Sequence, residues 1–316
     1  MPDGCSDRDI GRMSTRSCDD ASIAAPDDVD GAIGSAALAA ARRAGVSVRE
    51  LEAPADLTTA AELAATVWKT NTTSQLDVTL LRALSHTGNF VVGAFEDCGP
   101  EREDRLVGLS VGFVTLHPVL GLHSHMTGTA PDRRDRGLGY ALKLYQHTWA
   151  ARAGLAAVTW TFDPLVRRNA YFNLAKLGAE AVEYVADFYG PMGDGLNSGD
   201  ESDRLLMVWP VNPSAGPPPL AVPTEPGLPP GCDDVLEVGP GGAPRRSESS
   251  AELIACQVPA DIVALREKDP RAALRWRHAL REVIVDSMRR GYRIEAFTRS
   301  GHYVLRRRPT AAAGGG

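Results

Sequence analysis

The chain has 316 residues, of which 43% are hydrophobic and 23% charged, enough to bury the core of one large domain or two modest ones. Its formal net charge of −6 argues against general binding to nucleic acid, because that binding depends on Lys and Arg neutralising phosphates. No apolar run is long enough to span a bilayer, and the polar segment Met1 to Asp20 lacks the basic and apolar regions of a signal peptide. We therefore expect a globular cytoplasmic protein that does not bind membranes.

The cysteines are scattered and odd in number, and none forms a Cys-x-x-Cys pair. They are Cys5, Cys18, Cys98, Cys232 and Cys256. This usage suits a reducing compartment and predicts neither a disulfide framework nor a structural zinc site. We expect no bound metal.

The first part of the chain predicts a tail followed by a β-α-α-β unit. Residues 1–29 have few large apolar groups, so we expect them to be disordered. A helix over 31–44 ends at Gly45, which can adopt the left-handed conformation of a helix stop. The elements predicted next are a strand over 46–51, helices over 55–68 and 76–84, and a strand over 90–95.

The middle of the chain predicts strands on both sides of a glycine-bearing turn and a helix. Strands are expected over 105–115 and 121–129 and, beyond the turn and a helix that includes 140–149, over 156–162. A helix over 167–178 ends at Gly178, a polar loop follows over 181–204, and a strand covers 205–209.

The last part of the chain is punctuated by proline and glycine. We expect a linker over 210–230 and a loop over 239–250. Beyond 253 the pattern predicts a strand, a charged helix over 270–290 and a hairpin over 292–306. The low-complexity end, 309–316, is expected to be mobile.

The most informative segment is the turn Pro131-Asp-Arg-Arg-Asp-Arg-Gly-Leu-Gly139. Arginines and glycines before a helix start bring free backbone N–H groups, the positive end of the helix dipole and cationic side chains to one point. The turn therefore predicts a phosphate-binding site. It lacks the third glycine of a dinucleotide-binding loop and the Lys-Ser/Thr pair of a nucleoside-triphosphate loop. An ordinary arginine-rich surface turn remains the alternative explanation.

Two motifs in this order resemble the GNAT superfamily of N-acyltransferases. Arg134-x-x-Gly137-x-Gly139 is similar to its acyl-CoA-binding motif, and the segment from Asn169 to Lys176-Leu-Gly178 is similar to its next signature. The stretch from Thr159 to Gly178, with Asp187-Phe-Tyr-Gly190 after it, resembles a bacterial branch whose members are mostly called predicted acetyltransferases. The resemblance covers about residues 45 to 308.

The resemblance implies an α/β (α+β) fold with a mixed, mostly antiparallel twisted sheet flanked by helices. It places the acyl-CoA-binding domain at 30–211, a linker at 212–250 and a C-terminal α/β extension at 251–308. The expected co-substrate is acetyl-CoA or a related acyl-CoA. The acceptor is expected to be the amine of a small molecule or amino acid, and the protein a monomer or homodimer.

The implied CoA site joins the strand before the turn, the turn itself and the second motif helix. Backbone groups of the strand would pair with the pantetheine arm, and the amides of Arg134 to Tyr140 would hold the pyrophosphate. The residues expected to bind the cofactor are Met126, Thr127, Thr129, Arg134, Asp135, Arg136, Gly137, Leu138, Gly139, Tyr140, Asn169, Phe172 and Lys176.

Acyl transfer from a thioester also needs a proton acceptor for the amine and stabilisation of the departing thiolate. Many relatives place a tyrosine two residues before the lysine that ends the second motif helix, and this chain has Leu174 there. Tyr171, one turn earlier, is the substitute candidate for the acid, with a core aromatic as its alternative role. The candidate bases are His125, with His123 on the same face by strand alternation, and Asp163. For each of these three residues a purely structural role is the alternative.

The acceptor is expected to lie near the segments that follow the second motif. The residues assigned to it are Arg167, Tyr184, Phe188, Tyr189 and Arg204, with Asp203 beside them. Arg167 or Arg204 would hold a carboxylate, either of an amino-acid acceptor or of a dicarboxylic acyl group such as succinyl. A solvated surface ion pair is the simpler explanation for either arginine.

Three functions remain open from the sequence. The first is an N-acyltransferase. The second is a regulatory or structural protein that binds CoA without turnover, which Leu174 and the unclear base suggest. The third and weakest is a nucleotide-binding enzyme.

Overall fold

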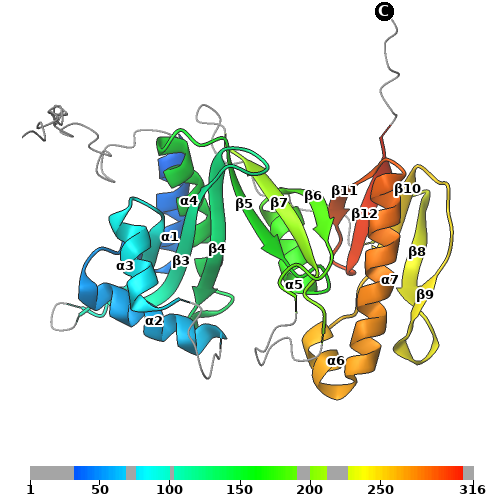
Figure 1. The fold of residues 1–316 in the computed structure, drawn as a ribbon, viewed down its shortest axis with the longest axis horizontal. Coiled ribbons are helices and arrows are strands. Elements are labelled where there is room, and N and C mark those ends of the chain that lie inside the picture. Colours follow the sequence, from blue (N-terminus) through cyan, green and yellow to red (C-terminus); the bar gives the residue numbers. More distant parts are fainter. Residues whose placement is uncertain (1–31, 69–75, 100–102, 191–199, 212–226, 309–316) are drawn as a thin grey trace, which may run out of the picture.

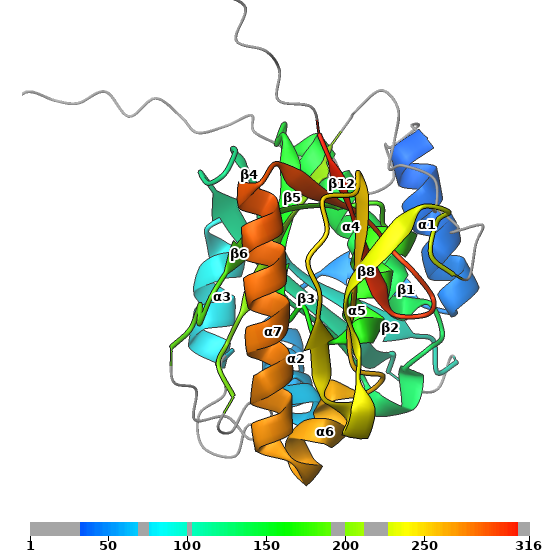
Figure 2. The same cartoon turned by 90° about the vertical axis from the view of Figure 1, so that its right-hand side faces the viewer.

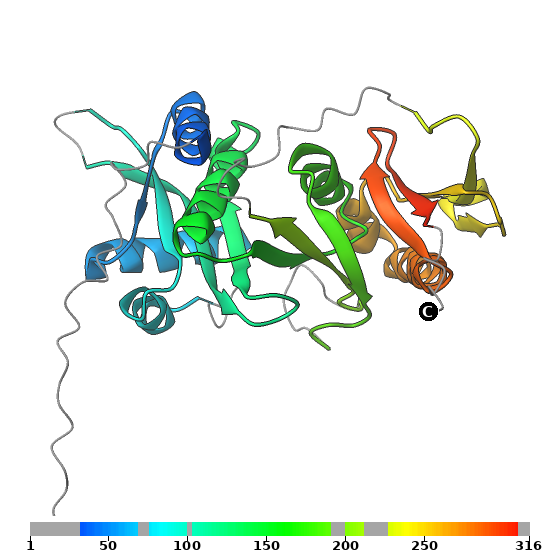
Figure 3. The ribbon, with the colours of Figure 1, turned by 90° about the horizontal axis from the view of Figure 1, so that it is seen from above.

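The computed structural model describes residues 32–68, 76–99, 103–190, 200–211 and 227–308. These residues form two mixed, mostly antiparallel sheets that follow one another along the long axis of the molecule, with helices packed on each (Figures 1 and 3). Our predictions for residues 1–29, for the linker part 212–226 and for the tail 309–316 lie outside the described residues. No helix in the described ranges is long and apolar enough to cross a membrane.

The first sheet has the strand order β1-β2-β3-β4-β5-β7-β6. All neighbouring strands are antiparallel except β4 and β5, which are parallel. The strands are β1 (Ser47–Glu50), β2 (Val91–Glu96), β3 (Arg105–Thr115), β4 (Gly121–Thr129), β5 (Ala157–Phe162), β6 (Glu180–Val185) and β7 (Arg204–Pro210). This confirms the predicted class of a mixed, mostly antiparallel sheet flanked by helices.

Helices cover both faces of this sheet. On one face α1 (Ala32–Ala44) packs against α4 (Leu138–Arg152), which buries Leu138, Leu142 and Leu144 (Figure 3). On the other face lie α2 (Pro54–Trp68) and α3 (Val78–His86), whose buried side chains form a second cluster with Leu109 and Val111 of β3. The sheet is thus the middle layer of a three-layer sandwich, in which strands buried on both faces need continuous apolar runs.

Strands β4 and β5 diverge partway along their length. They pair only at three positions, from Gly121–Ala157 to His123–Thr159. Beyond that point β4 continues to Thr129 and β5 to Phe162, and the two strands no longer pair with each other. Two parallel strands that diverge in this way leave backbone groups of both without a partner strand. The gap between them is where the candidate site lies.

The second motif helix is irregular. The single helix expected over 167–178 is an α-helical turn, α5 (Arg167–Ala170), followed by a π-helical segment over Tyr171–Lys176. The N–H of Leu177 donates to the carbonyl of Phe172, five residues earlier, and Gly178 ends the segment with φ of 66°. Wider turns of this kind are frequent at functional sites because they redirect side chains.

The loop predicted over 181–204 was wrong in its first part, which is the edge strand β6. Residues Glu180 to Val185 pair with β7, and Ala181 is buried. The charged residues Glu180 and Glu183 suggested a polar loop, but on an edge strand they are exposed, which antiparallel edges tolerate.

The second sheet has the order β11-β12-β10-β8-β9, and only β8 and β10 are parallel. Its strands are β8 (Cys232–Val238), β9 (Pro244–Arg246), β10 (Leu253–Gln257), β11 (Tyr292–Phe297) and β12 (His302–Arg307). Two helices, α6 (Ile262–Lys268) and α7 (Pro270–Arg289), follow β10 in the chain, and α7 packs against one face of this sheet (Figure 2). Asp269 caps α7 by accepting from the N–H of Ala272 at 2.9 Å.

Two strands of this sheet fall within residues that we predicted to be a linker, 212–250. The short apolar run Val235-Leu236 is buried at the centre of β8, and β9 pairs with β8. The flanking prolines and glycines hid a strand of only seven residues. The predicted linker therefore contributes to the C-terminal sheet from residue 232 on.

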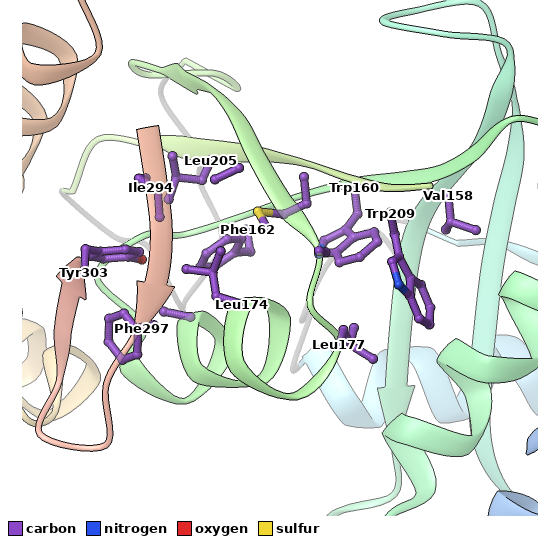
Figure 4. Close-up of a cluster of buried hydrophobic side chains, with 14 of the residues drawn as sticks. Val158, Trp160, Phe162, Leu174, Leu177, Leu205, Trp209, Ile294, Phe297 and Tyr303 are labelled. Atoms are coloured by element: carbon purple, nitrogen blue, oxygen red, sulfur yellow. The ribbon is translucent and has the colours of Figure 1, made fainter. Parts of the chain in front are cut away.

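The two sheets share one core where they meet. Phe162 of β5 and Leu174 of the π-helical segment belong to the same buried cluster as Ile294, Phe297 and Tyr303 of β11 and β12 (Figure 4). The hydroxyl of Tyr303 donates to the carbonyl of Pro164 at 2.7 Å. The C-terminal sheet therefore packs directly behind the end of β5, next to the gap.

Candidate active site

A cleft of about 1380 Å3 opens where β4 and β5 diverge. It is lined by β4 from Ser124 to Thr129, by the end of β5, by the start of α4 and by the π-helical segment. It therefore brings together residues from both predicted motifs. The predicted cofactor residues that line it are Met126, Thr127, Thr129, Arg134, Asp135, Gly137, Leu138, Gly139, Tyr140, Asn169, Phe172 and Lys176. Arg136 is the one predicted cofactor residue outside this lining.

The turn before α4 is a backbone cradle. Gly137 is the N-cap residue of α4 with φ of 80°, and Asp135 also has a positive φ of 64°. The carbonyl of Gly137 accepts from the N–H groups of Tyr140 and Ala141. The N–H groups of residues 136–139 have no acceptor among the described residues. Free amides at the positive end of a helix favour an anion.

Two arginines of this turn are free to add charge. Arg134 and Arg136 are exposed, and neither has a carboxylate partner within the described ranges. Their neighbours are occupied: Arg133 pairs with Glu96, and Asp132 accepts from Arg105 at 2.9 Å. Asp135 pairs with Arg168 at 2.9 Å, so the two aspartates of the turn are neutralised by cations other than Arg134 and Arg136.

Strand β4 offers its open edge to the cleft and carries a bulge. Val111 of β3 pairs with Met126 and Gly112 pairs with Ser124, so His125 has no partner on β3. From Ser124 to Thr129 no strand pairs with the β5 side of β4. This edge extends for about 17 Å, at about 3.3 Å per residue, and presents backbone donors and acceptors to a ligand with amide groups.

The two strand histidines have different environments. Both rings lie beside Phe113, with centroids 5.3 and 5.8 Å away, so they share a side of the sheet despite the bulge. His125 lines the cleft, whereas His123 does not, and His123 Nδ1 lies 3.1 Å from Thr159 Oγ1. Burial lowers the pKa of His123 to about 4 and lowers that of His125. Both imidazoles are therefore neutral at pH 7, and His125 is the one placed to accept a proton in the cleft.

Asp163 lines the cleft but is held by ion pairs. Arg277 donates to both of its carboxylate oxygens, and Arg266 donates to Oδ2 at 2.5 Å. Burial alone raises the pKa of Asp163, but the guanidinium groups of Arg277 and Arg266 outweigh burial and lower it. A carboxylate with a depressed pKa and two cationic partners is a weak base. Its geometry favours a structural role.

Tyr171 also lines the cleft, and its hydroxyl accepts from Arg299 Nε at 3.1 Å. Arg299 lies in the turn between β11 and β12, so the C-terminal sheet reaches the cleft wall. Leu174, at the position where many relatives carry tyrosine, is buried in the core. Lys176 Nζ lies 6.0 Å from the centroid of the Tyr171 ring.

The predicted acceptor residues divide into two groups. Tyr189 and Arg204 line the cleft, with the Arg204 guanidinium 5.1 Å from the centroid of the Tyr189 ring, and Phe188 stacks edge-on against Tyr189. Phe188 itself, Tyr184 and Arg167 lie outside the lining of the cleft. Tyr184 donates to Asp203 at 2.6 Å, and Arg167 donates to the carbonyl of Arg299 in a neighbouring pocket.

Asp203 belongs to the junction between the sheets rather than to an acceptor pocket. It is fully buried, and both of its oxygens accept from Arg281 of α7. The ion-pair partners of Asp163 and Asp203 lie 78 to 114 residues later in the chain, so no local pattern could reveal them.

Several residues that line the cleft were not predicted from the sequence. Val263, Arg266 and Arg299 come from the C-terminal extension, and Trp160 and Lys143 lie at the inner end of the cleft. A signal for Lys143 was present, because it interrupts an apolar helix face one turn after Gly139. Within the described ranges no group of three or more His, Cys, Asp or Glu side chains is placed to hold a metal ion.

No protein-family model matches the chain, and no curated protein does. The chain is similar to solved structures that include GNAT-family acetyltransferases. The ribosomal-protein-S18-alanine N-acetyltransferase of Escherichia coli is 15% identical, with 53% of this chain and 94% of that chain covered and a TM-score of 0.40. A GNAT-family acetyltransferase of Streptococcus pneumoniae is 15% identical, with 53% and 99% covered and a TM-score of 0.41. Chaetomium thermophilum Naa20, solved with a bisubstrate analogue, is 19% identical, with 53% and 88% covered and a TM-score of 0.41.

Proposed function

We propose that this protein is an N-acyltransferase of the GNAT superfamily, which transfers a short acyl group from CoA to an amine by direct attack. One observation carries the proposal: the open edge of β4 runs from the inner end of the cleft to the free amides before α4. The diphosphate of CoA suits the cradle with Arg134 and Arg136. The two amides of its pantetheine arm suit an unpaired strand edge, and on this proposal the thioester would lie at the inner end of the cleft, near the last β4–β5 pair.

His125 is the proposed base for the incoming amine. It sits in the bulge of β4, lines the cleft and keeps a neutral ring at pH 7 because its pKa is lowered. Neutral imidazole is the form that accepts a proton. An α-amino group, whose pKa is near 8, needs little help of this kind, whereas a lysine amine near 10.4 needs more.

The proposed acceptor is a small amine or amino acid. Arg204 lines the cleft without a carboxylate partner among the described residues and is suited to hold the carboxylate of an amino acid. Residues of α6 and of the β11–β12 turn narrow this end of the cleft, which favours a small acceptor over a protein N-terminus. We still expect the protein to be cytoplasmic, to be a monomer or homodimer, and to bind neither nucleic acid nor membranes.

The test mixes the protein with a panel of acyl-CoAs, acetyl and succinyl included, and a panel of amines, amino acids and N-terminal peptides, and measures release of the CoA thiol. We expect release with a small amine. CoA that raises the melting temperature without any release would support a binding protein instead. If ATP or NAD raises the melting temperature and CoA does not, both the acyltransferase and the CoA-binding protein are refuted.

A further inference from the structure

A buried lysine lies at the point where the two strands part. His123 and Thr159 form the last pair between β4 and β5, so Ser124 and Trp160 are the first residues on either side of the gap. Lys143 of α4 touches both. Its Nζ donates to Ser124 Oγ at 2.9 Å and lies 3.9 Å from the centroid of the Trp160 ring.

This lysine has no opposite charge beside it. Lys143 is 5% exposed, and no carboxylate among the described residues lies within ion-pair distance of its amino group. The groups that Lys143 contacts are neutral: the Ser124 hydroxyl and the Trp160 ring. Gln146, one turn along α4, donates to the same Ser124 Oγ at 2.8 Å. Such a site fixes the direction of the amino group and leaves its charge without a partner.

Burial lowers the pKa of Lys143 to about 7. Near neutral pH the amino group therefore exists in both protonation states, which is the condition for effective proton transfer. An unpaired buried ammonium is also costly by itself. A developing negative charge in the cleft would supply the missing partner.

We propose that Lys143 is the proton donor to the sulfur that leaves when the thioester is cleaved, an inference that rests on the proposed function. The amine nitrogen forms a bond to the carbonyl carbon, and the carbon–sulfur bond breaks with its electron pair on sulfur. The ammonium of Lys143 gives that sulfur a proton, and the attacking nitrogen loses one to His125. Ser124 and Gln146 act as positioning residues.

The other candidate for this task, Tyr171, is held by the β11–β12 turn of the C-terminal sheet. The hydroxyl of Tyr171 accepts from Arg299, and Leu174 stands where many relatives place the acid. Lys143 reaches the cleft from the opposite wall, on α4 rather than on the second motif helix. On this proposal the proton donor lies on α4 and not on the second motif helix, where many relatives carry a tyrosine.

The first experiment follows the thiol of CoA itself, with no acceptor needed. The ultraviolet absorbance of the thiolate is titrated with CoA bound to the wild type, to Lys143→Met and to the control Lys268→Met, which removes an exposed lysine of α6. A cation at the sulfur lowers the thiol pKa by about one unit or more. Lys143 itself loses its proton near pH 7, below the range in which a thiol titrates. We therefore expect the lowering in a third variant, Lys143→Arg, which keeps its charge, and a thiol pKa near that of free CoA in the wild type, the control and Lys143→Met.

The second experiment separates charge from proton transfer with the best amine of the panel. Lys143→Met is expected to lower kcat roughly 100-fold with little change in CoA affinity, and to abolish the fall of kcat above about pH 7 that loss of the Lys143 proton produces. Lys143→Arg keeps the charge but holds its proton at neutral pH. It is expected to lower the thiol pKa of bound CoA and still lose kcat.

Three results would overturn the proposal. Lys143→Met with unchanged kcat and pH profile would show that no proton comes from this residue. Loss of CoA binding in this variant, measured by calorimetry, would make Lys143 a binding residue. A wild type that binds no CoA at all would refute the proposed function, and with it this inference.

Discussion

Arg277 donates to both carboxylate oxygens of Asp163, with Nη1–Oδ1 at 3.2 Å and Nη2–Oδ2 at 3.0 Å. Arg277 belongs to α7 and is completely buried, while Asp163 directly follows β5 at the cleft. The same guanidinium donates to Asp200 at 2.7 Å. One side chain of the C-terminal extension thus fixes the end of the strand that forms one wall of the candidate site.

Replacing this arginine should be strongly destabilising. We expect Arg277→Met to lower the free energy of unfolding by up to about 3–5 kcal/mol, because it removes the more deeply buried of the two arginines that pair with Asp163 and Asp200 and leaves only Arg266. Chemical denaturation checks this, with Arg275→Met as control, since Arg275 is exposed on the same helix. An equal effect of the two substitutions would show that the buried ion pairs do not hold the sheets together.

The same cluster predicts sensitivity to acid. Burial by itself raises the pKa values of Asp163 and Asp200, but ion pairs and hydrogen bonds with Arg277 and Arg266 bring both below the ordinary value of 3.8. A lowered pKa in the folded state gives stability that is present above about pH 4 and lost as the pH falls further. Denaturation between pH 6 and pH 3 should show this loss, and a flat profile would contradict it.

Two glycines at opposite ends of α4 offer a matched test of the anion cradle. Gly137 and Gly154 have φ of 80° and 68°, and an added Cβ would meet open space at both. We expect Gly137→Ala and Gly154→Ala each to cost about 1 kcal/mol of stability through backbone strain. Only Gly137→Ala should also weaken CoA binding, measured by calorimetry, because its Cβ lies at the cradle. Equal affinities would place the diphosphate elsewhere.

Arg134 should contribute to affinity and not to folding. It is exposed and has no carboxylate partner among the described residues, so Arg134→Gln is expected to leave the melting temperature unchanged. The loss of one charge-assisted contact should weaken CoA binding about tenfold, and less at high salt. Arg105→Gln, which breaks the exposed pair with Asp132, should leave CoA affinity intact. A tenfold loss there as well would indicate a general effect of positive charge.

Lys143 should make stability depend on pH in the alkaline range. Its pKa is about 7 in the folded protein and near 10.4 when unfolded. Between these values the unfolded state binds more protons, so the free energy of unfolding should rise with pH, by up to about 1.4 kcal/mol per unit. Lys143→Met should remove this slope and be more stable at pH 7. A wild-type slope that survives the substitution would come from another group.

The sequence alone determined most regular elements of the first sheet and the glycine-bearing turn that we propose as the anion cradle. Strands and helices of the first sheet follow from local apolar periodicity, and the cradle follows from Gly137 and Gly139 beside Arg134, which act within one short segment. The seven-residue strand β8 was missed because flanking prolines and glycines dominate its neighbourhood, and the edge strand β6 because its exposed face is charged.

Only the tertiary structure decided what the candidate catalytic groups can do. Asp163 looked like a base until Arg266 and Arg277, more than a hundred residues later, were found on it. Lys143 was given no role from the sequence, and only the fold buries it beside Ser124 and Trp160, away from water. The acidity of a side chain depends on desolvation and on nearby charge, and both are properties of distant segments brought together by the fold.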